Sequence, residues 1–142
     1  MTSFEAKMAT LDDHRNIQRQ LAVYCIAVDR RDESLLRSVY HDDAYDDHAG
    51  EFAGPVDEFI PWVLTFLAND TFGFHQLGQS IIDIDGDRAT AETYWTSHRG
   101  IIDDDGGSRV VSSGGLYLDR FERRNDDRWR IAQRTVTRTW RA

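Results

Sequence analysis

The chain has 142 residues, of which 40% are hydrophobic and 30% charged, as is usual for one soluble globular domain. A net charge of −8 disfavours nucleic acid or an anionic membrane as the main partner, because phosphate groups bind to basic surfaces. The sequence has no apolar run long enough to span a membrane and no apolar signal core near its start. Its only cysteine, Cys25, excludes an intrachain disulfide. We therefore expect a single domain over residues 1–142 in the reducing cytoplasm.

The chain is predicted to begin with two helices. Thr10 and Asp13 have the spacing of a capping box, and apolar side chains then recur at helical spacing, so a first helix should run to about Asp29. Asp32 is the expected N-cap of a second helix, whose apolar positions extend to Tyr40. Both helices have an apolar face that must be buried against another element.

An acidic stretch, HDDAYDDHAG, follows the second helix. We expect His41, Asp42 and Asp43 in solvent at the end of that helix, and a short strand over residues 44–49. Alternation along this strand places Asp46 and His48 on one face. If that face points inward, the two side chains lie in the wall of a polar pocket.

A third helix is predicted after Gly54-Pro55, with apolar positions that extend to Leu67. Pro61 conflicts with a helix that begins at Pro55, because a proline inside a helix removes a backbone hydrogen-bond donor. A start near Asp57 is therefore the alternative.

After Asn69 the hydrophobic period changes to two, which predicts four long strands over residues 72–84, 88–101, 109–123 and 128–140. Asp85-Gly86 is a hairpin signal, and Gly114-Gly115 predicts a bulge or sharp bend. Three helices and a short strand, followed by four antiparallel strands, predict an α+β fold. In such a fold a strongly curved sheet, covered by helices, forms a cone around a small-molecule pocket.

Three polar residues interrupt the apolar pattern. Asp29 ends the apolar face of the first helix, His75 lies within a strand, and Arg134 shares a strand face with Ala132 and Val136. Each has an ordinary structural explanation when taken alone. Together they suggest a general base, because a carboxylate that accepts one imidazole N–H orients the ring and raises the basicity of the other nitrogen. An arginine opposite the base could bind a developing anion.

Three segments carry a resemblance to a known family: IAVDRRDESLLRSVYHDDA, FGFHQLGQ and GGLYLDRFERRNDDRWRIAQR. In this order they resemble SnoaL-like domains of the nuclear-transport-factor-two-like superfamily, which include hexachlorocyclohexane dehydrochlorinase, bile acid 7α-dehydratase and scytalone dehydratase. The resemblance implies a cone-shaped α+β barrel. It does not by itself settle the reaction, because the superfamily also contains isomerases, cyclases and non-enzymatic subunits.

The resemblance implies four catalytic residues. Asp29 and His75 match the acid and the base of the family's His-Asp dyad. Arg134 matches a pocket arginine, and Tyr24 matches a catalytic tyrosine that could donate a proton to a leaving hydroxyl group or polarise a carbonyl. The resembling enzymes use no metal, so we expect no metal and no cofactor, although Asp46, His48 and His75 could also form a two-histidine, one-carboxylate metal site.

Substrate-binding residues are expected on the strands that follow. Asp46 and His48 are candidates on the short strand, together with Trp95, His98 and Tyr117 on the longer ones. The register of His98 is open by one residue, which decides the face it occupies. If Trp95 and Ser97 point inward, His98 faces solvent.

The leading hypothesis is a cofactor-free lyase, of dehydratase or dehydrohalogenase type, that acts on a small cyclic hydrophobic molecule. The alternatives are an isomerase or cyclase of the ketosteroid-isomerase kind, and a non-catalytic binding domain such as the small subunits of aromatic-ring dioxygenases. The resemblance also implies a homotrimer or homodimer, with Trp129 and Trp140 as possible contact residues.

Overall fold

A computed structural model describes residues 3–142, so the first two residues of the predicted domain lie outside the described part. The described residues form three helices and six strands, in the order α1 (Phe4–Arg30), α2 (Glu33–Ser38), β1 (Tyr40–His48), β2 (Phe52–Pro55), α3 (Val56–Leu67), β3 (Phe72–Asp85), β4 (Arg88–Ile102), β5 (Ser108–Arg123) and β6 (Trp129–Arg141).

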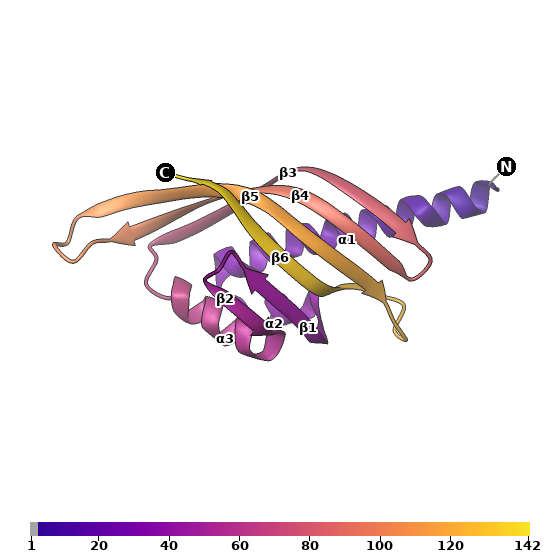
Figure 1. The fold of residues 1–142 in the computed structure, drawn as a ribbon, viewed down its shortest axis with the longest axis horizontal. Coiled ribbons are helices and arrows are strands. Elements are labelled where there is room, and N and C mark those ends of the chain that lie inside the picture. The colour runs from indigo at the N-terminus through magenta and orange to yellow at the C-terminus, as the bar shows by residue number, and fades with distance from the viewer. Residues whose placement is uncertain (1–2) are drawn as a thin grey trace.

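The six strands make one curved, unclosed sheet with the order β2-β1-β6-β5-β4-β3. Strands β3 to β6 are joined as consecutive antiparallel hairpins, whereas β1 lies parallel to β6 and carries β2 at the edge. The three helices lie along one side of the curved sheet (Figure 1). This arrangement confirms the predicted α+β class and the four predicted long strands.

Helix α1 begins earlier than predicted. Ser3 is its N-cap and accepts a hydrogen bond from the amide of Ala6, whereas Thr10 lies inside the helix and its hydroxyl donates to the carbonyl of Ala6. The first turns are exposed to solvent, yet they carry Phe4, Met8 and Leu11 at helical spacing, so the capping-box spacing of Thr10 and Asp13 pointed to too late a start. At the other end Arg31 adopts a left-handed conformation, and its amide bonds to carbonyls of the last turn.

Strand β1 begins at Tyr40, where the sequence predicted the end of the second helix. The N-cap of α2 is Asp32, as predicted. His41, expected in solvent, is buried, and its Nε2 lies 2.8 Å from the carbonyl oxygen of Glu122. The short edge strand β2 was not predicted, since four residues carry too little periodicity to stand out.

Helix α3 begins at Val56 with Pro55 as its N-cap, and Pro61 lies inside it. The interior proline is tolerated because it sits on the exposed side of the helix. Losing one backbone hydrogen bond there costs about 3 kcal/mol, whereas each large apolar side chain buried on the opposite side stabilises by about 1.5–3 kcal/mol. Those buried side chains are Phe59, Ile60, Val63 and Leu67.

The register of β5 and β6 shifts between Gly114 and Gly115, which confirms the predicted bulge. A Cβ atom on Gly115 would collide with the carbonyl oxygen of Thr137, and one on Gly114 would lie 2.5 Å from Nε1 of Trp140. Only glycine therefore allows β6 to approach β5 so closely at the point where the sheet bends.

The core fills the space between the helices and the concave side of the sheet. Its fully buried members include Ile17, Leu21, Leu36, Phe59, Ile60, Phe121 and Ile131. Trp129, expected at a contact surface between subunits, is instead buried, and its Nε1 donates to Asp13. No helix within residues 3–142 is long and apolar enough to cross a membrane.

Candidate active site

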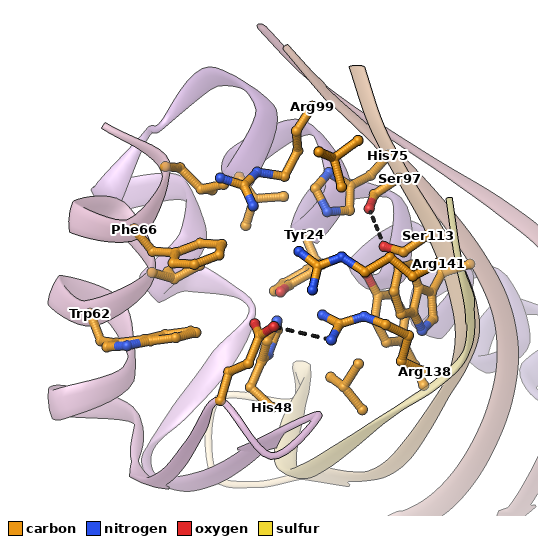
Figure 2. A pocket seen from close by; sticks show the side chains of 18 residues that line it. Tyr24, His48, Trp62, Phe66, His75, Ser97, Arg99, Ser113, Arg138 and Arg141 are labelled. Carbon is orange, nitrogen blue, oxygen red and sulfur yellow. Dashed lines mark hydrogen bonds and ion pairs between the residues drawn. The ribbon is translucent and has the colours of Figure 1, made fainter. Parts of the chain in front are cut away.

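A cavity opens between α1, α3 and the concave side of the sheet (Figure 2). It encloses about 660 Å³ of empty space, counting its open mouth. Aromatic side chains form much of its wall, namely Trp62 and Phe66 on α3 (Figure 2) and Trp95 and Tyr117 on the sheet. The rings of Trp95 and Tyr117 stack with centroids 5.6 Å apart. A lining of aromatic rings with a few polar groups among them suits a small ring compound.

Asp29 and His75 form a hydrogen-bonded pair beside the cavity, although 46 residues separate them in the chain. Oδ1 of Asp29 lies 2.6 Å from Nδ1 of His75, and Oδ2 accepts the backbone N–H of His75 at 2.9 Å. Both carboxylate oxygens thus bind the same residue and fix its ring. His75 lines the cavity, and its Nε2 has no hydrogen-bond partner among residues 3–142.

Local structure brings this pair together. Asp29 is in the last turn of α1, which stops because Arg31 turns the chain. Gly73 on β3 faces Asp29, and even a Cβ there would lie only 3.4 Å from its Oδ1. The side chains of His75 and Asp29 are 13% and 19% exposed to solvent. The hydrogen bond between them is therefore shielded from water, while the imidazole ring stays accessible.

A second pair, Asp46 and His48, lies on the same face of β1, as alternation predicted. Nδ1 of His48 is 3.0 Å from Oδ1 of Asp46, and the hydroxyl of Tyr40 donates to Oδ2 at 2.8 Å. His48 lines the cavity, while Asp46 is 0% exposed and lies behind it. Asp46 therefore does not itself line the cavity, and its hydrogen bond holds a ring that does.

Arg134 is fully buried and is not part of the cavity lining. Its Nε and Nη2 donate to the two carboxylate oxygens of Asp119 at 2.7 and 2.8 Å. The guanidinium carbon lies 4.2 Å from the ring centre of Tyr24 and 4.0 Å from that of Tyr117. Arg134 thus supports the two tyrosines that line the cavity, and the pocket arginine implied by the resemblance lies one layer behind the cavity surface.

Burial controls the chemistry of the groups around Arg134. Burial alone lowers the pKa of Arg134, but Asp119, Tyr40 and Tyr24 together outweigh it, so the net pKa lies well above its usual value. Burial raises the pKa of the Tyr24 phenol far above its ordinary value, although Arg134 opposes the shift. Burial also raises the pKa of the Cys25 thiol to about 12. Tyr24 is therefore a hydrogen-bond donor that keeps its proton, and Cys25 is no nucleophile.

Three arginines, Arg99, Arg138 and Arg141, complete the cavity lining (Figure 2). Arg99 makes a bidentate ion pair with Asp70, which lies outside the lining, and Arg138 bonds to Glu51 at 3.0 Å. Arg141 has no ion-pair partner among residues 3–142. Arg138 was not among the residues predicted from the sequence, although alternation along β6 places it on the face of Arg134.

The remaining predicted substrate contacts divide between the two faces of the sheet. Trp95 and Tyr117 line the cavity, and so does Ser97. His98 lies on the opposite face of β4, where its Nδ1 is 2.7 Å from the hydroxyl of Ser112. The pairing of β3, β4 and β5 therefore selects the alternative in which Trp95 and Ser97 point inward.

Within residues 3–142 no group of three or more His, Cys, Asp or Glu side chains is arranged to hold a metal ion. Asp46, His48 and His75, which the sequence allowed as metal ligands, are not gathered into one site. Instead each histidine is bonded to its own carboxylate.

Comparison with known proteins places this fold in a family. A family model described as a SnoaL-like domain matches residues 9–135. An uncharacterised protein of Mycobacterium tuberculosis (strain ATCC 25618 / H37Rv) is 30% identical over 133 residues, which are 92% of this chain and 88% of the relative.

Two solved structures share the fold at lower identity. A putative scytalone dehydratase from Novosphingobium aromaticivorans is 16% identical with a TM-score of 0.85, and the match covers 96% of this chain and 90% of that one. A hexachlorocyclohexane dehydrochlorinase from Novosphingobium barchaimii is 17% identical with a TM-score of 0.80, covering 96% and 92%. The chain belongs to the SnoaL-like domain family.

Proposed function

We propose that this protein is a lyase that uses the Asp29–His75 dyad to remove a carbon-bound proton from a small cyclic substrate. The observation that carries the proposal is the pair itself, in which both oxygens of Asp29 are bonded to His75. With Asp29 accepting from Nδ1, the lone pair of His75 is on Nε2, the nitrogen without a protein partner. The similarity to a putative dehydratase and a dehydrochlorinase supports the same reaction class.

In the proposed reaction His75 Nε2 takes a proton from carbon, and Asp29 stabilises the imidazolium that results. The electron pair left on carbon forms a double bond and expels a leaving group, or moves first into an adjacent carbonyl. Tyr24 donates a hydrogen bond to the oxygen on which negative charge develops. Arg134 acts as a positioning residue, because it contacts the rings of Tyr24 and Tyr117 and not the cavity. Each step uses only side chains of this chain.

The proposal is tested by following carbon-bound protons in heavy water. Wild type and His75→Ala are incubated with cyclic β-hydroxy ketones, chlorinated rings and unsaturated steroids, and mass spectrometry records deuterium uptake and loss of water or HCl. We expect wild type to exchange or eliminate with at least one of these compounds, and His75→Ala to do neither.

A matched control is His98→Ala, because His98 is also a partly buried strand histidine but lies on the opposite face. It should keep wild-type turnover, and circular dichroism should show that both variants fold. Product of unchanged mass would make the protein an isomerase. No exchange with any compound would contradict catalysis and favour a non-catalytic binding or assembly role.

We also propose that the protein is a homo-oligomer, a trimer or a dimer, that associates through the outer face of its sheet. No helix covers this face (Figure 1). It carries large exposed apolar side chains, namely Phe74, Tyr94 and Trp140, which are 52%, 59% and 43% exposed. Sedimentation velocity should give a mass above 16.4 kDa, and Tyr94→Arg should shift the protein to monomer. A wild-type monomer at micromolar concentration would contradict this.

A further inference from the structure

A second imidazole–carboxylate pair borders the cavity, and the proposed proton abstraction does not use it. His48 and Asp46 repeat the arrangement of the first dyad: one ring nitrogen bonds to a carboxylate, and the ring lines the cavity. His75 and His48 lie on opposite sides of the cavity in Figure 2, with Tyr24 between them. One cavity thus has two histidines that could each handle a proton.

The surroundings of His48 do not require a histidine for packing alone. Its ring contacts Phe59 and Trp62, with centroids 5.2 and 5.7 Å apart, where an apolar ring would pack without a polar partner. The polar partner of His48 is Asp46, whose side chain is fully buried. Burying a carboxylate costs free energy unless its charge is balanced and its oxygens are hydrogen-bonded. The side chains hydrogen-bonded to Asp46 are His48 and Tyr40. Both oxygens of Asp46 are thus hydrogen-bonded, and one of them holds the imidazole ring that lines the cavity.

Elimination of water needs an acid as well as a base, because hydroxide is a poor leaving group. Tyr24 is unsuited to full proton transfer, since burial raises the pKa of its phenol and disfavours the phenolate that would remain. An imidazole gives up and regains a proton readily near neutral pH. His48 is the other titratable side chain of this kind in the cavity lining.

We propose that His48, held by Asp46, is the general acid of a dehydration, so that the substrate is a cyclic β-hydroxy carbonyl compound. This inference rests on the proposed function of the Asp29–His75 dyad. His75 takes the proton from the carbon next to the carbonyl, and the C–H electron pair becomes the new C=C bond. The C–O bond breaks with its electron pair on oxygen, and His48 Nε2–H protonates that oxygen to give water. Solvent then removes the proton from His75 and restores the proton of His48.

The experiment compares two leaving groups on one carbon skeleton. Wild type and His48→Gln are assayed with a cyclic β-hydroxy ketone and with its β-chloro counterpart, in heavy water, by mass spectrometry. Chloride leaves without protonation, so only the hydroxy compound depends on the acid. We expect His48→Gln to lower kcat for water loss by about 10²- to 10⁴-fold. Loss of chloride and deuterium uptake at carbon should change by no more than a few-fold.

Asp46→Asn is the companion variant for the positioning role of the carboxylate. It should reproduce the leaving-group dependence of His48→Gln, with a larger effect on kcat than on KM. His98→Gln, on the opposite face, is the matched control and should behave as wild type with both compounds.

The outcomes separate this inference from the function on which it rests. Equal losses with both leaving groups would mean that His48 only maintains the cavity, and undiminished water loss would mean that it transfers no proton; either result overturns the inference while the dyad stands. If wild type takes up no deuterium from any compound, the proposed base is wrong and the inference falls with it.

Discussion

Asp29→Asn is expected to lower kcat by about 10²- to 10⁴-fold while leaving the protein folded. An asparagine has one acceptor oxygen and one NH2 group in place of two acceptors. If its oxygen accepts the backbone N–H of His75, the NH2 group faces Nδ1 and donates to it. The ring is then held in the tautomer that carries its proton on Nε2, and it presents a donor to the cavity where a base is needed.

Steady-state kinetics with the compound that wild type turns over, and deuterium uptake at carbon, measure this effect. KM should change far less than kcat, because Asp29 acts on the base and not on the substrate. Asp83→Asn is the matched control, since Asp83 is an exposed carboxylate on the same strand as His75. Near-normal kcat in the Asp29→Asn enzyme would show that the carboxylate does not set the tautomer, and the dyad mechanism would fail.

Asp119→Ala is expected to destabilise the protein by about 3–5 kcal/mol, because it leaves the fully buried guanidinium of Arg134 without its bidentate partner. The Asp103–Arg109 pair is the control. Its side chains are 38% and 56% exposed, so Asp103→Ala should cost no more than about 1 kcal/mol. Urea unfolding followed by fluorescence and circular dichroism gives both free energies of unfolding.

A double variant, Arg134→Met with Asp119→Leu, separates the value of the ion pair from the cost of breaking it. Replacing both charges by apolar side chains removes the uncompensated charge, so we expect this variant to be much more stable than Asp119→Ala. Its catalysis should still be impaired, since Tyr24 and Tyr117 lose the cation that packs on their rings. A double variant no more stable than Asp119→Ala would show that shape, and not charge, decides this part of the core.

Elements with a strong local period could be predicted from the sequence. The four long strands, the Asp85-Gly86 hairpin and the Gly114-Gly115 bulge were predicted correctly. Their signals are the alternation of apolar and polar residues and the glycines at turns and bulges, and both can be seen in neighbouring residues. The start of α1 was missed because the capping-box spacing of Thr10 and Asp13 pointed to a later start, although Phe4, Met8 and Leu11 have helical spacing before it. Tyr40 continued a helical pattern, but the parallel pairing of β1 with β6 makes it the first residue of a strand.

Candidate residues could be predicted in type more readily than in position. The family resemblance selected Asp29, His75, Tyr24 and Arg134, and the alternation of AYDDHA grouped Asp46 with His48. Whether His98 or Ser97 points inward was not decided by the sequence, since a shift of one residue reverses every side chain of a strand. The pairing of β4 with its neighbours settles this in favour of Ser97.

The fold class and the residue types available for proton transfer follow from the amino-acid sequence, because hydrophobic period and side-chain chemistry are local properties. Which of these residues meet depends on the tertiary structure. In the folded chain Asp29 is hydrogen-bonded to His75, 46 residues away, and the Asp46–His48 pair borders the same cavity. Arg134 lies behind two tyrosines, where it pairs with Asp119. Such partnerships depend on strand register and on where a helix ends against the sheet, and both are fixed by packing between segments far apart in the chain.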